Sequence, residues 1–208
     1  MIKIIFFDFD GTIANTKNIY YNAIINNLKE KGFSEKEVLR IINLGLNLKS
    51  SLDRIGLSFF SKWVLNKKII KDLRSNFKDI DKCKGLTKIK EIKNKILVSN
   101  SKKSLIIPIL INLKIKNYFM EIYGSEDFSE KGKFLIEYIK HKKVLPQECC
   151  YVGDRAADVR VAKDIKCKSI IISNKCSWNS KKEIKSERPD FIIKDLSEVR
   201  KIISILNS

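Results

Sequence analysis

Residues 4–12 read Ile-Ile-Phe-Phe-Asp-Phe-Asp-Gly-Thr, and this stretch decides the fold that the chain is expected to adopt. An unbroken apolar run that ends at a glycine turn is typical of a strand buried on both faces of a parallel sheet. In an open α/β sheet the ligand site lies just beyond the carboxyl ends of the strands. Asp8 and Asp10 lie at that position, so the stretch predicts a parallel α/β sheet with two carboxylates at its binding edge.

Asp8 and Asp10 stand at alternate positions of an extended segment, so their side chains are expected to point to the same side. Two like charges that close are costly unless they share a proton or a divalent cation. Mg²⁺ is commonly held by one or two carboxylates together with substrate phosphate, and an aspartate is also able to attack phosphorus as a nucleophile. The pair therefore points to phosphoryl transfer, against the alternative of two ordinary solvated acids in a turn.

Two later apolar runs end in polar residues in the same way. Ser99 and Asn100 follow the first of these runs, and Asp154 follows the second, with Asp158 one helical turn further on. Predicted strands alternate with predicted helices along the chain, which indicates a parallel, doubly wound α/β sheet with right-handed crossovers. The carboxyl ends of parallel strands lie on one edge of a sheet, so we expect these side chains to converge with Asp8 and Asp10.

The motifs as a set resemble those of the haloacid dehalogenase-like hydrolases. The segment 8–12, Asp-Phe-Asp-Gly-Thr, is similar to the first motif of that family, Ser99 to the second, and Gly-Asp-Arg-Ala-Ala-Asp at 153–158 to the fourth. Taken singly, Ser99 also fits the end of a strand and Asp154 a helix cap. The resemblance covers nearly the whole chain and implies a Rossmann-like core. Within it, the segment 113–128 looks like the link that follows the second motif in phosphoglycolate-phosphatase-like members.

The resemblance implies a role for each site residue. Asp8 would be the nucleophile and Asp10 the general acid/base. The cofactor would be Mg²⁺, held by Asp8, Asp154, Asp158 and the backbone carbonyl of Asp10. The transferring phosphate would be bound by Thr12, Ser99, Asn100 and a lysine, with Thr12 orienting either Asp10 or the phosphate loop.

The lysine implied by the resemblance is either Lys131 or Lys133, which flank Gly132. Relatives commonly place this lysine at the start of a helix that leads into the strand before the Gly-Asp pair. Lys131 fits the spacing to Asp154 better. Lys133 stays as the alternative, because many relatives have Gly-Lys-Pro where this chain has Gly-Lys-Phe.

Helical spacing of apolar residues fills the segment between the first strand and the second, including a short helix expected at 48–54. This segment resembles the cap that family members carry after the first motif. We therefore expect a catalytic core formed by residues 1–14 and 82–208 and a small all-helical cap formed by 15–81. Within the core, Pro108 is expected to kink or break the helix at 101–113, and the polar segment 174–189 is expected to be a loop.

The composition limits the other classes. The net charge is +18, but the charges are scattered through helical patterns rather than interleaved with stacking aromatics, which favours a bias of composition over a nucleic-acid surface. The five cysteines form no Cys-x-x-Cys pair, and there is a single histidine, so a zinc site is disfavoured. Reduced, buried thiols indicate a cytoplasmic protein, and no apolar run is long enough to span a membrane.

These observations together favour a Mg²⁺-dependent phosphomonoester hydrolase that acts on a small phosphorylated metabolite through an aspartyl-phosphate intermediate. Asp10 argues against dehalogenation, since a dehalogenase relative would lack this acid/base residue. A sugar-phosphate mutase shares every motif and stays as an alternative. A nucleic-acid-binding protein or a nucleic-acid-end phosphatase is a second alternative because of the net charge. The protein is expected to be a monomer or a homodimer.

Overall fold

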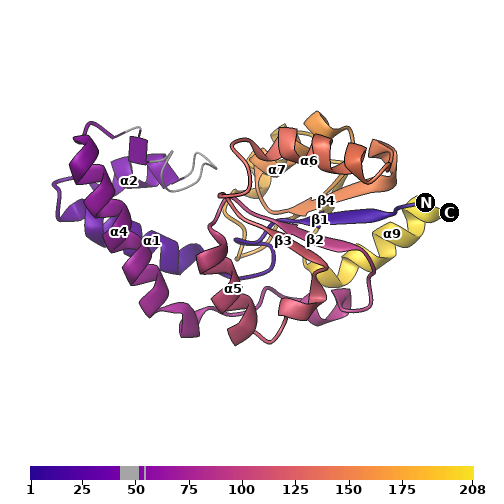
Figure 1. Cartoon of the computed structure of the whole chain (residues 1–208), viewed down its shortest axis with the longest axis horizontal. Coiled ribbons are helices and arrows are strands. Elements are labelled where there is room, and N and C mark those ends of the chain that lie inside the picture. Colours follow the sequence, from indigo (N-terminus) through magenta and orange to yellow (C-terminus); the bar gives the residue numbers. More distant parts are fainter. Residues whose placement is uncertain (43–51, 54) are drawn as a thin grey trace.

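The computed structural model describes residues 1–42, 52–53 and 55–208, and its centre is a six-stranded sheet in which every pairing is parallel (Figure 1). In spatial order the strands are β3 (Glu121–Tyr123), β2 (Lys95–Val98), β1 (Ile4–Phe7), β4 (Cys149–Gly153), β5 (Lys168–Ile172) and β6 (Phe191–Ile193). The strand order reverses beside β1, which lies between β2 and β4. The doubly wound α/β fold predicted from the sequence is confirmed.

Helices cover both faces of the sheet because alternate residues of each strand point to opposite sides. Ile5 and Phe7 of β1 belong to the hydrophobic cluster under α5 and α9, and Ile4 and Phe6 belong to the cluster under α6 and α7. The bounds of these helices are α5 (Lys103–Asn112), α6 (Lys131–His141), α7 (Ala156–Ile165) and α9 (Val199–Asn207). Figure 1 shows the two helical layers above and below the sheet.

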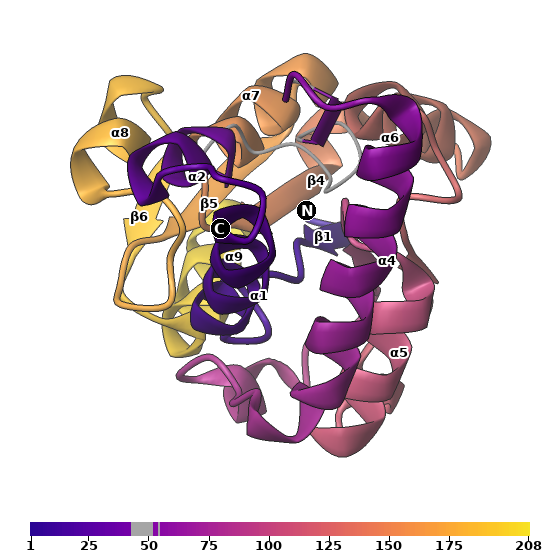
Figure 2. The ribbon, with the colours of Figure 1, turned by 90° about the vertical axis from the view of Figure 1, so that its left-hand side faces the viewer.

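Three further helices lie together beyond one end of the sheet (Figures 1 and 2). They are α1 (Lys17–Lys29), α2 (Glu35–Ile42) and α4 (Phe59–Ser75). Their buried side chains, among them Leu28 and Ile69, form a hydrophobic cluster separate from those of the sheet. Only Leu105 and Trp178 reach this cluster from outside the segment 15–81, among the buried residues that the structure describes. These two side chains therefore join the helices to the sheet.

The chain enters and leaves this helical segment at one place, which we call the neck (residues 13–16 and 81–83). The backbone N–H of Asn15 donates to the carbonyl of Asp81 at 2.9 Å, and that of Cys83 donates to the carbonyl of Ile13 at 3.0 Å. The neck lies where the segment 15–81 meets the sheet, and the role of this segment as a cap stays a prediction. The short helix expected at 48–54 lies mostly outside the described residues.

Two local expectations are wrong in part. Helix α5 runs through Pro108, because a proline there removes one hydrogen bond while the buried face of the helix, including Ile106 and Ile109, stays packed. The segment 174–189 contains helix α8 (Lys181–Ser186), which begins at a capping box between Ser180 and Glu183. Short 3-10 turns complete the fold: η1 (Phe77–Asp79), η2 (Leu86–Ile89), η3 (Lys116–Tyr118), η4 (Pro146–Glu148) and η5 (Leu196–Glu198). None of the helices described is both long enough and apolar enough to cross a membrane.

Candidate active site

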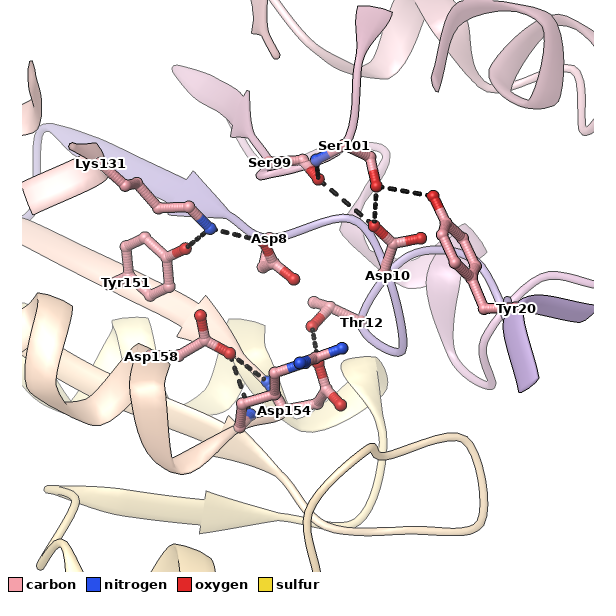
Figure 3. A network of polar contacts seen from close by, with 11 residues as sticks. Asp8, Asp10, Thr12, Tyr20, Ser99, Ser101, Lys131, Tyr151, Asp154 and Asp158 are labelled. Atoms are coloured by element: carbon pink, nitrogen blue, oxygen red, sulfur yellow. Dashed lines mark hydrogen bonds and ion pairs between the residues drawn. The ribbon is translucent and has the colours of Figure 1, made fainter. Parts of the chain in front are cut away.

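Three carboxylates meet at the carboxyl edge of the sheet (Figure 3). Asp8 follows β1, Asp154 follows β4, and Asp158 lies in the first turn of α7. One carboxylate oxygen from each of the three lies within 4.8 Å of the other two, and all three residues are buried. The convergence follows from the topology, because β1 and β4 are paired neighbours and the backbone N–H of Asp8 donates to the carbonyl of Val152 at 2.8 Å.

Asp158 is fixed by the start of its own helix. Its Oδ2 accepts hydrogen bonds from the backbone N–H groups of Asp154 and Arg155, at 3.0 and 2.9 Å. This contact needs a glycine at position 153, since a Cβ there would lie 2.4 Å from the carboxyl carbon of Asp158. The Gly-Asp-x-x-x-Asp spacing thus has a packing reason as well as a chemical one.

Gly11 occupies an equally crowded place. Its φ is +81°, and a Cβ added there would lie 2.4 Å from Oδ2 of Asp154 and 2.6 Å from Cδ1 of Trp178. We expect Gly11→Ala to lower the free energy of unfolding by about 2–4 kcal/mol, because the strained backbone and the clash add together. Gly32 is the matched control, since it has φ +84° and no atom within 4 Å of an added Cβ. Gly32→Ala should cost only about 1 kcal/mol, and equal losses in urea unfolding would contradict the clash.

The carboxylate cluster concentrates negative charge in a buried place. Burial, and next the charge of Asp158, raises the pKa of Asp154 well above its ordinary value. Burial, and next the charge of Asp8, raises the pKa of Asp158. A hard divalent cation such as Mg²⁺ would offset this charge, and carboxylate oxygens are the ligands it prefers. The donor set therefore fits such an ion.

Lys131 is the lysine that the structure brings to the cluster. Its Nζ donates to Oδ1 of Asp8 at 2.7 Å and to the hydroxyl of Tyr151 at 2.9 Å, and its side chain is 7% exposed. Lys133 instead pairs with Glu130 at 2.7 Å, and its side chain is 75% exposed. A shift of two positions on a helix turns the side chain to the opposite face, so only one of the two lysines reaches Asp8.

Asp10 lies outside this cluster, on the side where Tyr20 of α1 and Ser101 lie (Figure 3). Its Oδ1 accepts a hydrogen bond from Thr16 at 2.8 Å. Its Oδ2 accepts from Ser101 at 2.6 Å and from Ser99 at 3.4 Å. Burial, and next the charge of Asp8, raises the pKa of Asp10, which favours the protonated form. Hydroxyl donors on both oxygens therefore fix the orientation of a carboxyl group that is suited to deliver a proton.

The other predicted site residues, Thr12, Ser99 and Asn100, lie around the carboxylate cluster and Asp10. Thr12 donates to Oδ1 of Asp154 at 3.2 Å, so its hydroxyl supports the cluster while Thr16 and Ser101 hold Asp10. Ser99 also accepts a hydrogen bond from the backbone N–H of Ser101, at 3.0 Å. Asn100 is half-buried between them in the sequence.

Sequence reasoning missed five residues that complete the site. They are Thr16, Tyr20, Ser101, Tyr151 and Trp178. Thr16 lies just beyond the first motif, and Ser101 lies at the end of the second, where its residue type is equally typical of a helix cap. The hydroxyl of Tyr20, which hydrogen-bonds to Ser101 at 2.8 Å, and the backbone N–H of Trp178, which donates to Asp154 at 2.6 Å, reach the site only through tertiary contacts.

Comparison with known proteins agrees with this geometry. The model of the family described as haloacid dehalogenase-like hydrolase matches residues 5–172, so the chain belongs to that family. Curated relatives named phosphoglycolate phosphatase include one from Vibrio parahaemolyticus, 24% identical over 98% of this chain and 97% of its own length. Another, from Aquifex aeolicus, is 26% identical over 97% of each chain.

Solved structures show the same fold. A structure described as a predicted phosphoglycolate phosphatase from Haemophilus somnus has a TM-score of 0.81 at 19% identity, over 97% of this chain and 98% of its own. CbbY from Rhodobacter sphaeroides, solved in complex with phosphate, has a TM-score of 0.77 at 15% identity, over 96% of each chain. The predicted family, the α/β fold and the enzyme class, a haloacid dehalogenase-like phosphatase, are confirmed.

Proposed function

We propose that the protein is a Mg²⁺-dependent phosphomonoester hydrolase that acts on a small phosphorylated metabolite through an aspartyl-phosphate formed on Asp8. The observation that carries the proposal is the buried cluster of Asp8, Asp154 and Asp158, with Lys131 bound to Asp8. The names of the curated relatives make phosphoglycolate the first substrate to test.

Asp8 and Asp10 would divide the chemistry between them. Asp8 attacks phosphorus, the bond from phosphorus to the leaving oxygen breaks, and Asp10 gives its proton to that oxygen. Asp10, now a carboxylate, takes a proton from water as the water attacks the aspartyl-phosphate, which releases phosphate and restores both aspartates. The hydroxyls of Thr16 and Ser101 keep Asp10 in place for both proton transfers.

Lys131 and Ser99 would stabilise the transferring phosphoryl group. Lys131 holds Oδ1 of Asp8, so the orientation of the nucleophile is fixed before the substrate arrives, and its charge opposes that of the phosphate oxygens. Asp8, Asp154, Asp158 and the backbone carbonyl of Asp10 would hold the metal ion. When bound, Mg²⁺ offsets negative charge on the phosphate as a Lewis acid.

The helical segment 15–81 would act as a cap over this site. Two observations support this role. The neck joins the segment to the sheet beside the turn at Asp10, and the hydroxyl of Tyr20 reaches Ser101 at the site. A lobe in that place is able to admit substrate when open and to exclude water when closed.

Phosphate release from a panel of small phosphate esters tests the proposed function. We expect turnover with Mg²⁺ and a loss to background when a chelator removes the ion, because the cluster would then lack the charge that offsets its own repulsion. Release that is unchanged by the chelator would contradict the metal dependence. Transfer between sugar phosphates without net release would instead indicate a mutase.

A thermal melt gives a second readout of the metal. An ion that binds only the folded state at 100 times its Kd adds about 2.7 kcal/mol of stability, so Mg²⁺ should raise the Tm of the wild type. Asp154→Asn should remove this increase. The exposed Asp79 supplies the control, because Asp79→Asn leaves the cluster intact and should keep it.

A further inference from the structure

Arg155 lies at the site but is not explained by the chemistry above. It directly follows Asp154, is half-buried, and places its guanidinium carbon 4.1 Å from the centre of the Trp178 ring. In the part of the chain that the structure describes, no ion pair joins this guanidinium to a carboxylate. Arg160, on the helix that begins directly after Arg155, pairs instead with Glu187.

Trp178 holds the guanidinium in a fixed place. Its backbone N–H is bound to Asp154, and its ring packs against Tyr20 and Tyr21 of α1, with ring centroids 5.8 and 5.6 Å away. The Trp178 ring thus lies where the helical segment meets the catalytic edge of the sheet. A planar cation stacked on an indole keeps its N–H donors directed outward at the edge of the plane.

The indole adds a donor of its own. Nε1 of Trp178 is buried and has no hydrogen-bond partner among the described residues. The neighbouring ring carbon Cδ1 lies against Gly11, in the turn between Asp10 and Thr12. A buried donor without a protein partner is costly, and an anionic ligand would relieve that cost.

Arg155 directly follows Asp154 at the carboxyl edge of the sheet. The lysines nearby are engaged elsewhere: Lys131 binds Asp8, and Nζ of Lys17 donates to the carbonyl of Ser177 at 2.8 Å. Arg155 is therefore a half-buried cation at this edge that no ion pair engages among the described residues.

We propose that Arg155, mounted on Trp178, binds a second anionic group of the substrate, so that the preferred substrates are short phosphate esters with a further carboxylate or phosphate. This inference rests on the proposed function, because the first phosphate must occupy the Asp8 site. The guanidinium presents parallel N–H donors that match a carboxylate or a phosphate in a two-pronged contact.

A simpler role would be to offset the charge of four buried carboxylates, those of Asp8, Asp10, Asp154 and Asp158. Among the described residues of the site, Lys131 is the only buried cation that opposes them. The two roles predict different results. A residue that only offsets charge affects every phosphate ester alike, whereas a residue that binds the second anion affects only the esters that carry one.

The test compares kcat/KM for 2-phosphoglycolate and for 2-hydroxyethyl phosphate, in which a neutral hydroxymethyl group replaces the carboxylate. Arg155→Met keeps an unbranched apolar side chain on the indole and removes the charge. It should lower kcat/KM for 2-phosphoglycolate about 10- to 100-fold and change that for 2-hydroxyethyl phosphate less than about threefold. Arg155→Lys keeps the charge but loses the parallel N–H donors of the guanidinium. Its kcat/KM for 2-phosphoglycolate should lie between those of the wild type and Arg155→Met. Arg160→Met, the matched control on α7, should leave both values unchanged.

Binding of two unreactive phosphonates gives a readout that does not need turnover. By calorimetry in the presence of Mg²⁺, the wild type should bind phosphonoacetate more tightly than methylphosphonate, and Arg155→Met should remove the difference. If Arg155→Met removes the difference in affinity between the two phosphonates while the wild type turns over no ester, the second anion site is supported and the proposed hydrolysis is contradicted. Turnover by the wild type, with a ratio of the two substrates that neither Arg155→Met nor Arg155→Lys changes, would overturn the role of Arg155 and leave the hydrolase intact.

Discussion

Asp8→Asn is expected to abolish phosphate release, lowering kcat by at least about 10⁴-fold, as the loss of a covalent nucleophile does in other enzymes. An asparagine oxygen is still able to accept the hydrogen bond from Lys131, so the geometry around the side chain is kept. The substitution also removes one of three carboxylates that crowd within 4.8 Å. In the presence of a chelator, the Tm of Asp8→Asn should therefore equal or exceed that of the wild type.

The measurement is phosphate release with Mg²⁺, together with a thermal melt in chelator. Asp79→Asn is a suitable control because Asp79 is an exposed aspartate outside the cluster. It should retain wild-type activity and an unchanged melt. An Asp8→Asn protein that is folded and active would end the proposed mechanism, because no aspartyl-phosphate could then form at this position.

Lys131→Met is expected to lower kcat/KM about 10²- to 10³-fold, the loss typical when one preorganised donor to a developing charge is removed. The reason is the contact at 2.7 Å between its buried Nζ and Asp8. Without it, the proposed nucleophile loses its ion pair and the phosphate loses one of the positive charges that oppose its own. Lys133→Met is the matched control in the same helix. It removes only an exposed ion pair with Glu130, so its activity should stay within about twofold of the wild type.

The pair of lysine variants also tests the structure itself. Both variants remove one positive charge from the first turns of α6, so an effect of net charge on an anionic substrate would appear in both. A loss confined to Lys133→Met would contradict the placement of Lys131 at Asp8. Equal losses would show that the long-range field of the protein, rather than a contact, governs the rate.

The elements that the sequence predicted well are those in which local pattern and tertiary position agree. Each apolar run that ends in Asp8, Ser99 or Asp154 is a strand of one parallel sheet, and parallel topology then brings the strand ends to a common edge. The predicted cluster therefore needed no knowledge of distances. Helix α8 was missed although its capping box, Ser180 with Glu183, is visible in the sequence.

Other features depend on contacts that no local pattern encodes. Which of Lys131 and Lys133 reaches Asp8 depends on which face of α6 packs against the sheet. The spacing of the two lysines in the sequence does not determine that face. Thr12 lies beside Asp154 because Gly11 reverses the chain with a positive φ. The stacking of Arg155 on Trp178 joins two segments that are separated in the sequence by a helix and a strand.

The neck makes the register of the sheet independent of the length of the helical segment. The two ends of the segment, Asn15 and Asp81, are joined by a backbone hydrogen bond. Adding or removing a helical turn between them therefore leaves the pairing of β1 with β2 and β4 in register. Asp8 and Asp154 depend on that register and not on the length of the segment. A segment of different length between these two points would therefore leave the carboxyl edge of the sheet, with Asp8 and Asp154, in the same geometry.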